Sequence, residues 1–455
     1  MLTLLLAYLF FIPFFFYTIV ANISYWLRIR QKRKLGVNKN ANEVVIVVLG
    51  DLGHSPRITY HAKSFIKLGY VVNICGYVES QVPYFLYDEN VSINEIKVIK
   101  NTHRLPYIVF AANKVVQQVF ELFKVLSGVI DDNTRYVLIQ NPPSLPVLAV
   151  LAFLKMTICP NVKIIIDWHN LNFTILNLRF HNLKHPIVRL MKNYERILSK
   201  KYADLNFTVT EAMRDYLIKE FHLDSNKVIT VYDRPSNKFE PLMDEEEFDE
   251  IIASNPAIFE DFAYNKETDK ILITSTSFSA DEDFSILVEA LKKLDDTLGD
   301  MKGSFRILMI VTGKGPLKLD FLKEVKEFNW KRVRVTDVWL TDDEYPKILR
   351  IADLGISLHY SSSGLDLPMK IVDLFGSGVP VVSMGYHVIS ELVTEGKNGL
   401  LLKDNHSGQE LADTIYHALY EDKHLLGTLR SGARKESERG WDDEWDEKLA
   451  NLLKL

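Results

Sequence analysis

The amino-acid sequence predicts an α/β protein in which two Rossmann-like domains follow one another behind an N-terminal transmembrane helix. Three observations support this fold class. The chain has 455 residues, which is too many for a single hydrophobic core. Short apolar, β-branched segments alternate with helix-like segments, and this series restarts near the middle of the chain. The chain also begins with a charge-free apolar stretch that is long enough to cross a bilayer.

The apolar stretch runs from Leu2 to Leu27 and contains no charged residue. As a helix with a rise of about 1.5 Å per residue, it exceeds the roughly 30 Å hydrocarbon thickness of a bilayer. Five basic residues follow between Arg28 and Lys34, and by the positive-inside rule they predict a cytosolic body. A cleaved signal peptide is the alternative. In a signal peptide, however, the basic residues precede the apolar stretch, whereas in this chain they follow it. Residues 1–34 are therefore expected to form a transmembrane anchor with a basic flank.

The first Rossmann-like domain is expected over residues 35–240. A strand at 43–49, a glycine-containing turn, a helix ending near residue 68 and a strand at 70–76 are typical of the opening of a doubly wound sheet. Further buried strands are predicted at 136–140, 163–167, 205–210 and 227–231. Two strongly apolar segments, 105–129 and 145–154, are either core helices or helices that lie on a membrane.

The second Rossmann-like domain is expected over residues 270–455 and ends in C-terminal helices. Its strands are predicted at 270–275, 306–312, 332–336, 354–358 and 379–383. The acidic stretch 241–269, which contains the run Glu245–Glu247, is expected to be a linker or a solvated insertion.

Composition excludes several classes of function. Beyond residue 34 the chain holds 49 basic and 59 acidic residues, a net charge of −10, which argues against a nucleic-acid partner. The two cysteines, Cys75 and Cys159, allow at most one disulfide, as is usual in a reducing compartment. With 47% hydrophobic and 25% charged residues, the chain is neither disordered nor fibrous.

The turn after the first strand, Gly50 to Arg57, carries the first candidate for chemistry. It lacks the glycine spacing of a dinucleotide site, and no acidic residue ends the next strand, so a nicotinamide site is not expected. Asp51 and His54 are candidates for acid–base chemistry at this turn. The alternative role for Asp51 or Ser55 is to cap the following helix.

Two loops in the second half favour a diphosphate ligand. Gly313, Lys314 and Gly315 end one strand and precede a helix, so backbone amides and an ammonium group lie together. This loop is not a P-loop, because the glycine spacing differs and no Ser or Thr follows the lysine. The second loop contains Ser363, Gly364 and Leu365 and leads into a helix that carries Lys370 and Asp373 near its start. A nucleotide diphosphate can bind at such a helix end while a carboxylate accepts ribose hydroxyls.

The order of these motifs resembles the donor domain of GT-B glycosyltransferases. The shared features are the Lys-Gly turn, a Leu-Pro-x-Lys helix start with an acid three residues later, Gly-x-Pro-Val-Val, and Glu391 before Gly396-Lys397-Asn398-Gly399. Six segments in order are similar to the family of chitobiosyldiphosphodolichol β-mannosyltransferases. They are 50–57, 140–143, 167–170, 232–235, 275–284 and 361–370.

The resemblance implies an enzyme that transfers mannose from GDP-mannose to dolichyl-diphosphate-linked chitobiose at the cytosolic face of the endoplasmic reticulum. It implies the membrane, this lipid-linked acceptor and other mannosyltransferases of the same pathway as partners. No cofactor is expected, since GDP-mannose is itself a substrate. A required metal is not expected either, because the acidic run Asp281–Asp283 lies at a predicted helix start, where acids favour the helix dipole. Two alternatives remain: a GT-B transferase with another donor, and an inactive glycosyltransferase-like scaffold on the membrane.

The resemblance also implies roles for individual residues. On the donor side, Asp373 is expected to bind ribose and Asp366 the mannose. Charge for the leaving diphosphate is expected from Lys314, Lys370 and Arg234, because Ser275 stands where relatives often carry basic residues. An α-linked donor and a β-linked product require inversion, hence one general base. The candidates for that base, in order, are Asp51, His169 and His54.

Overall fold

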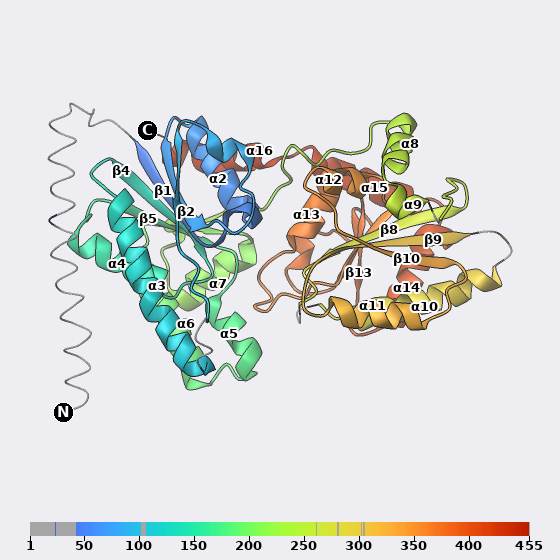
Figure 1. The fold of residues 1–455 in the computed structure, drawn as a ribbon, viewed down its shortest axis with the longest axis horizontal. Helices are drawn as coiled ribbons and strands as arrows, with labels where there is room; N and C mark the ends of the chain where they lie inside the picture. The colour runs from blue at the N-terminus through green and yellow to red at the C-terminus, as the bar shows by residue number, and fades with distance from the viewer. Residues whose placement is uncertain are drawn as a thin grey trace. The chain divides into compact units, whose positions relative to one another are not determined.

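The computed structural model describes residues 42–101, 106–260, 262–279, 282–301 and 305–454, together with Ile23 and Gly303. The described chain divides into two compact units (Figure 1). Unit 1 comprises the chain up to Val231 together with Trp445–Leu455, and unit 2 is Tyr232–Glu444. This division differs from the expected boundaries in two respects. The last eleven residues return to unit 1, and residues 241–269 belong to unit 2.

The expected transmembrane anchor, residues 1–34, lies outside the described residues apart from Ile23. Among the helices that the structure does describe, none combines the length and the apolar character needed to cross a bilayer.

Unit 1 is built on one sheet of seven parallel strands in its described part, in the order β3-β2-β1-β4-β5-β6-β7. The chain builds outward from β1 to β3 and then resumes on the other side of β1 with β4, so the order of winding reverses between β1 and β4. The strands are β1 (Glu43–Asp51), β2 (Val71–Tyr77), β3 (Val91–Glu95), β4 (Thr134–Asn141), β5 (Lys163–Trp168), β6 (Leu205–Thr208) and β7 (Val228–Thr230).

Helices cover both faces of this sheet, which explains why its central strands are apolar throughout rather than alternating. The helices of unit 1 are α2 (Pro56–Lys67), α3 (Tyr107–Val129), α4 (Val147–Thr157), α5 (Asn172–Phe180), α6 (Pro186–Tyr202) and α7 (Glu211–Phe221). Short turns of helix lie at η1 (Leu52–His54), η2 (Tyr84–Tyr87) and η3 (Ser225–Lys227). Six of the eleven residues of α4 are buried, so the apolar segment 145–154 contributes a core helix.

The C-terminal residues complete the core of unit 1. The chain end forms η6 (Asp446–Ala450) and α17 (Asn451–Leu453). Trp445, Leu449 and Leu453 are fully buried, and the Tyr70 hydroxyl donates to the Leu453 carbonyl at 2.6 Å. The indole of Trp445 packs edge-on against Phe65, with ring centroids 5.6 Å apart.

Unit 2 holds a second parallel sheet, of six strands in its described part, in the order β10-β9-β8-β11-β12-β13. Its winding reverses between β8 and β11. The strands are β8 (Asp269–Thr276), β9 (Arg306–Gly313), β10 (Val333–Val338), β11 (Leu354–Ser357), β12 (Val381–Met384) and β13 (Gly399–Leu402). The helices are α8 (Glu245–Ser254), α9 (Pro256–Phe259), α10 (Phe284–Asp300), α11 (Lys318–Glu327), α12 (Glu344–Arg350), α13 (Met369–Gly376), α14 (Gly408–Tyr416), α15 (Leu425–Ser437) and α16 (Trp441–Trp445). The last residue of α16, Trp445, already belongs to unit 1.

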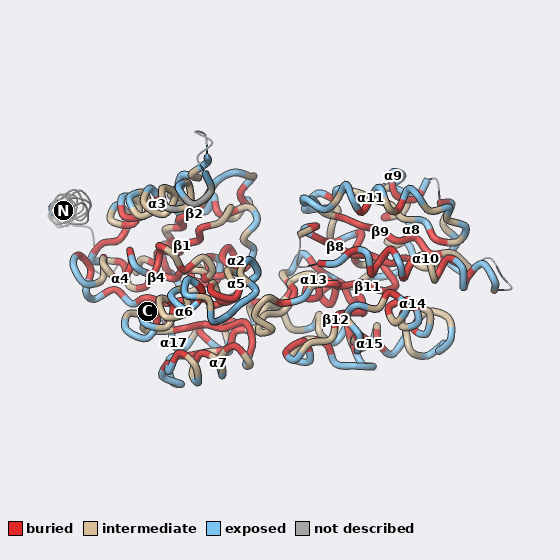
Figure 2. The backbone as a smooth tube through the Cα atoms, turned by 90° about the horizontal axis from the view of Figure 1, so that it is seen from below, coloured by how far each residue is buried: buried red, intermediate tan, exposed pale blue. Residues whose placement is uncertain are grey.

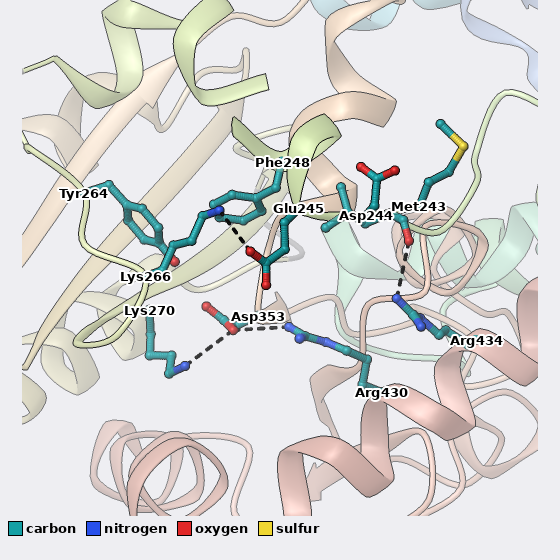
Figure 3. A pocket seen from close by; sticks show the side chains of 11 residues that line it. Met243, Asp244, Glu245, Phe248, Tyr264, Lys266, Lys270, Asp353, Arg430 and Arg434 are labelled. Carbon is teal, nitrogen blue, oxygen red and sulfur yellow. Dashed lines mark hydrogen bonds and ion pairs between the residues drawn. The ribbon is translucent and has the colours of Figure 1, made fainter. Parts of the chain in front are cut away.

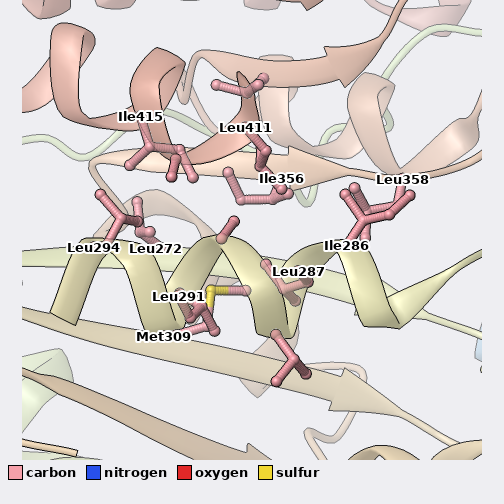
Figure 4. Packing of buried hydrophobic residues seen from close by; sticks show 14 of the residues in the cluster. Leu272, Ile286, Leu287, Leu291, Leu294, Met309, Ile356, Leu358, Leu411 and Ile415 are labelled. Carbon is pink, nitrogen blue, oxygen red and sulfur yellow. The ribbon is translucent and has the colours of Figure 1, made fainter. Parts of the chain in front are cut away.

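Successive residues of the unit 2 strands pack into two different cores. Leu272 and Met309 face the core that includes α10 and α14, whereas Ile271 and Ile273 face the opposite core. Figure 4 shows the first core, where Leu287 and Leu291 of α10 lie against the sheet. Ile251 of α8 and Ile258 of α9 are buried in the second core, so the acidic stretch is a structural part of this domain. The buried strands run through the middle of each unit in Figure 2.

Candidate active site

Ligands of doubly wound sheets bind beyond the carboxyl ends of the strands, where the winding reverses. In unit 1 this point lies beyond β1 and β4, and in unit 2 it lies beyond β8 and β11. Most of the candidate residues follow these strands or their neighbours. Asp51 ends β1, His169 follows β5, Ser275 lies at the end of β8, and Gly313 ends β9.

The Asp51 carboxylate is held by several donors. The Ser80 hydroxyl and the backbone amides of Glu79 and Ser80 donate to it, and the His54 ring nitrogen Nδ1 lies 2.7 Å from its Oδ2. Burial raises the pKa of Asp51, but these hydrogen bonds outweigh burial and lower the pKa to about 2. The Asp51 side chain makes no cap bond to η1 and the Ser55 side chain makes none to α2, so neither acts as a helix cap. Asp51 is an ionised group that orients His54, whose side chain is 69% exposed.

A second carboxylate and imidazole meet after β5. Asp167 is fully buried, and Arg57 of α2 binds both of its oxygens at 2.9 Å. His169 Nε2 lies 2.8 Å from Asp167 Oδ2, and His61 Nε2 lies 3.3 Å from the same oxygen. Burial raises the pKa of Asp167, but Arg57 and the two rings lower it well below its ordinary value. Arg57, the second residue of α2, therefore anchors this cluster.

The buried side of the Asp167 cluster ends in an indole. Trp445 Nε1 donates to His61 Nδ1 at 3.1 Å, so Nε2 carries the proton of the neutral ring and faces Asp167. Burial holds the pKa of His61 below its ordinary value, against the attraction of Asp167. Sequence reasoning missed this contact because its partners are separated by most of the chain.

Glu195 of α6 is a buried carboxylate that sequence reasoning also missed. It accepts from the backbone amides of Asn172 and Phe173, the first residues of α5, and from the side-chain amide of Asn141 at the end of β4. Burial raises the pKa of Glu195 to about 7, although these donors lower it. Glu195 thus ties the end of β4 to the start of α5.

In unit 2 the Gly313–Gly315 loop packs directly against the loop after β8. A Cβ atom on Gly313 would lie 1.8 Å from the Thr276 carbonyl oxygen, and one on Gly315 equally close to the Ser277 carbonyl oxygen. Gly313 also has a φ of 147°, which disfavours other residues. Lys314 between them is exposed, with its ammonium 3.5 Å from the centre of the Trp339 ring. The glycines therefore present Lys314 at the carboxyl edge.

Lys370, the second residue of α13, forms a buried ion pair with Glu282. The Thr276 hydroxyl donates to the other oxygen of Glu282 at 2.5 Å. Glu282 is 3% exposed, while Asp283 beside it caps α10 through the amide of Ser285. Glu282 of the acidic run 281–283 is therefore the partner of Lys370, while Asp283 caps the helix. Asp281 lies outside the described residues.

The serine-rich loop after β11 is organised by Asp366. The hydroxyls of Ser361 and Ser363 donate to Asp366 Oδ1, and His359 Nε2 lies 3.4 Å from its Oδ2. Gly364 adopts a left-handed φ of 70°, and its amide donates to the Ser361 hydroxyl. The Leu365 amide donates to the Ser363 hydroxyl at 3.2 Å. This loop is an ordered turn between β11 and α13.

Asp373 lies one turn into α13 and is partly buried. Burial raises its pKa to about 7, and Asp233 adds to this effect while Lys238 opposes it. The Tyr345 hydroxyl lies 3.4 Å from Asp373 Oδ2 and 3.0 Å from the Ser275 hydroxyl. Tyr345 therefore contacts both Ser275 and Asp373 near the point where the winding of the unit 2 sheet reverses.

Arg234, expected as a source of charge for a diphosphate, is paired with two carboxylates in the structure. Its guanidinium pairs with Glu444 at 3.3 Å and with Glu436 at 3.5 Å, and Glu444 is almost fully buried. Arg439 also binds Glu444. Arg234 is a structural ion-pair partner that joins its own segment to the end of unit 2.

Unit 2 also contains a cavity of about 390 Å³ (Figure 3). This cavity does not lie at the carboxyl edge of the sheet. Lys270, near the start of β8, and Asp353, just before β11, line it, so it lies at the amino ends of the strands. Its basic groups already have carboxylate partners, such as Arg430 with Asp353 and Lys266 with Asp249. It is not a candidate for the donor site. No group of three metal-binding side chains occurs among the described residues.

Comparison with known proteins agrees with this geometry. A family described as glycosyl transferases group 1 matches residues 269–421. Sucrose-phosphate synthase from Thermosynechococcus elongatus aligns over 89% of this chain and 96% of its own, with a TM-score of 0.66 and 13% identity. WaaG, a glycosyltransferase involved in lipopolysaccharide biosynthesis, aligns over 90% and 99%, with a TM-score of 0.62 and 14% identity. The two doubly wound domains and the family match define a GT-B glycosyltransferase.

Closer relatives narrow this class. A protein of Debaryomyces hansenii named chitobiosyldiphosphodolichol β-mannosyltransferase is 48% identical over 96% of this chain and 91% of its own length. The human protein of the same name is 32% identical over 94% of this chain and 95% of its own. The chain belongs to the chitobiosyldiphosphodolichol β-mannosyltransferase family.

Proposed function

We propose that this chain transfers mannose from GDP-mannose to chitobiose carried on dolichyl diphosphate, with inversion at the anomeric carbon. The observation that carries this proposal is 48% identity to a relative with that name over nearly the whole chain. The carboxyl edge of unit 2 supports it, since the edge offers an exposed lysine, glycine loops and a half-buried carboxylate for a sugar nucleotide.

On the donor side, the amides of the Gly313–Gly315 loop and the Lys314 ammonium would bind the diphosphate. Lys314 is the best candidate for stabilising the leaving group, because Lys370 is paired with Glu282 and Arg234 with two glutamates. Asp373 would accept ribose hydroxyls, and Asp366 with its serine loop would bind the mannose. No metal is needed in this account.

On the acceptor side, inversion requires one base for the attacking hydroxyl. Asp51 was the first candidate from the sequence, but a carboxylate with a pKa of about 2 is a weak base. We assign the base to His54, which Asp51 orients and whose positive charge Asp51 would stabilise. His169 is less suited, because Arg57 already neutralises Asp167, so protonating His169 would add excess positive charge.

We also propose that residues 1–34 anchor the chain in the membrane of the endoplasmic reticulum, with the body in the cytosol. The basic flank after the apolar stretch supports this orientation. The Asn-x-Ser/Thr sequons of the body, at Asn90, Asn172, Asn206 and Asn405, should then remain unmodified. A mass loss after enzymatic deglycosylation of the native protein would contradict the orientation.

The experiment that tests donor choice uses the purified full chain in detergent. It is incubated with a chitobiosyl-diphosphate lipid and, in separate reactions, GDP-mannose, UDP-glucose or UDP-N-acetylglucosamine. We expect a product of one added hexose with GDP-mannose alone. Transfer from a uridine donor instead would favour the alternative donor, and no transfer together with no GDP binding would favour the scaffold alternative.

A further inference from the structure

Unit 1 exposes a cluster of large aliphatic side chains on α5, α6 and the turn between them. These two helices pack side by side (Figure 1). Six large apolar residues within 23 positions are between 40% and 70% exposed: Ile175, Leu178, Leu183, Ile187, Leu190 and Ile197. We call this set the α5–α6 surface. The apolar helix α4, by contrast, faces the core.

Helix α6 has a buried face and, separate from it, an exposed apolar stripe. Val188, Glu195 and Ser199 are buried and mark the face that packs on unit 1. Ile187, Leu190 and Ile197 recur at spacings of three and seven residues, which places them in one stripe on another side of the helix. A surface helix needs only the first face for packing, so the second requires a separate explanation.

The charge around this stripe is strongly basic. Residues 172–202 contain seven lysines and arginines and one acidic residue, the buried Glu195. Arg189, Lys200 and Lys201 of α6 are exposed. The body of the chain carries a net charge of −10, so a local excess of six positive charges is opposite in sign to the rest of the molecule.

We propose that the α5–α6 surface docks unit 1 on a bilayer that contains anionic lipids. Exposed aliphatic side chains would enter the boundary between head groups and acyl chains, and the basic residues would meet lipid phosphates. Each basic residue near an anionic membrane strengthens such binding by about fivefold. Protein interfaces favour aromatic residues and disfavour lysine, whereas the α5–α6 surface is made of aliphatic residues and four of the seven basic residues in 172–202 are lysines. This contact is separate from the proposed anchor, residues 1–34. The inference rests on the proposed function in one respect, namely that the acceptor is a membrane lipid.

A fluorescent probe at one position tests the contact directly. The full chain carrying Leu190→Cys is labelled with an environment-sensitive dye and reconstituted into vesicles of phosphatidylcholine with or without phosphatidylserine. The native Cys75 and Cys159 are buried and should not react. The matched control is Leu319→Cys on α11 of unit 2, a leucine that is 78% exposed and lies outside the surface.

We expect the dye at position 190 to shift to the blue and to be quenched by spin-labelled lipids, more strongly with phosphatidylserine, while the dye at 319 stays in water. No other protein is present, so equal solvent exposure at both positions would overturn the proposal and leave a protein partner as the alternative occupant.

A paired activity measurement separates docking from chemistry. The double variant Leu190→Asn with Ile197→Asn should lose about tenfold or more of its activity on acceptor lipid in vesicles, because two apolar side chains no longer bind the membrane. Its activity on a short-chain acceptor in detergent should equal that of the unchanged chain. Equal loss on both acceptors, or on neither, would overturn the docking role. Failure of the unchanged chain on both acceptors would count against the proposed function, while the dye measurement would stand by itself.

Discussion

At the scale of single residues, two ionised carboxylates in unit 1 each contact an imidazole, and their surroundings decide which ring can take up a proton. Asp167 is already paired with Arg57, whereas the other donors to Asp51 are neutral. Protonation of His54 therefore forms a pair with Asp51, and this difference underlies the assignment of the base.

Removing the His54 ring should lower kcat by at least about 100-fold, the lower end for a positioned base. Asp51→Asn should lower kcat as well, because the ring loses its orientation and the partner for its positive charge. His169→Ala, with an equally stable fold, should retain most of the activity. Full activity in His54→Ala would show that another group is the general base.

The pH dependence of kcat/KM distinguishes His54 from Asp51 as the base. A histidine base in general becomes inactive below about pH 6, by roughly tenfold per pH unit. Asp51, with a pKa of about 2, would stay deprotonated throughout that range. We expect kcat/KM to fall on acidification well before the pH range in which Asp51 takes up a proton. Activity that persists unchanged to pH 4 would identify the carboxylate as the base. Because its folded pKa is depressed, Asp51 stabilises the fold above about pH 4, and this contribution is lost as the pH falls toward 2.

A further prediction about a single residue concerns Lys314. Lys314→Ala should lower kcat by about 100-fold, by analogy with loss of one donor to the transition state. The matched control is Lys323→Ala on α11, an exposed lysine away from the strand ends, which should change kcat little. Steady-state kinetics with GDP-mannose check both variants, and equal behaviour would make Lys314 an ordinary surface residue.

At the scale of elements, the Gly313–Gly315 loop and the loop after β8 fit together only because the first of them carries glycines. Gly315→Ala would place a methyl group against the Ser277 carbonyl oxygen, so the loops must separate. We expect a lower melting temperature for unit 2 and weaker GDP binding by calorimetry. Gly427→Ala on α15 is the control, since a Cβ there meets open space and should stabilise the helix by up to about 1 kcal/mol. Unchanged GDP binding in Gly315→Ala would contradict this packing.

Most strands could be predicted because buried parallel strands are short apolar runs, and β1, β5 and β9 lie within two residues of their expected ranges. β3 and β13 were not predicted. β3 contains no fully buried residue, and β13 begins at Gly399, which the sequence analysis assigned to the glycine motif Gly396–Gly399 rather than to a strand. Asp51, Ser275 and Gly313 lie at the carboxyl ends of strands, as the sequence predicted. The contact partners at the site were not predicted, since Glu282 with Lys370 and Trp445 with His61 are joined by tertiary structure alone.

At the scale of the whole molecule, the chain leaves unit 1 at Val231 and returns to it at Trp445. Trp445→Ala should destabilise unit 1 by about 3–5 kcal/mol, because a fully buried indole and its bond to His61 are lost. Hydrogen exchange should increase in unit 1 and remain unchanged in unit 2. The control is Leu452→Ala, whose side chain is 46% exposed and should cost little. Equal exchange in both units would contradict the division.

The central claim is inverting transfer of mannose to a lipid-linked chitobiose, and the linkage in the product tests it most directly. The full chain is incubated with GDP-mannose and chitobiosyl-diphosphate lipid, and the released trisaccharide is treated with a β-mannosidase or an α-mannosidase. We predict that β-mannosidase alone removes the added hexose and regenerates chitobiose. Removal by the α-mannosidase would contradict the account, because the configuration would then be retained and no single base would be required.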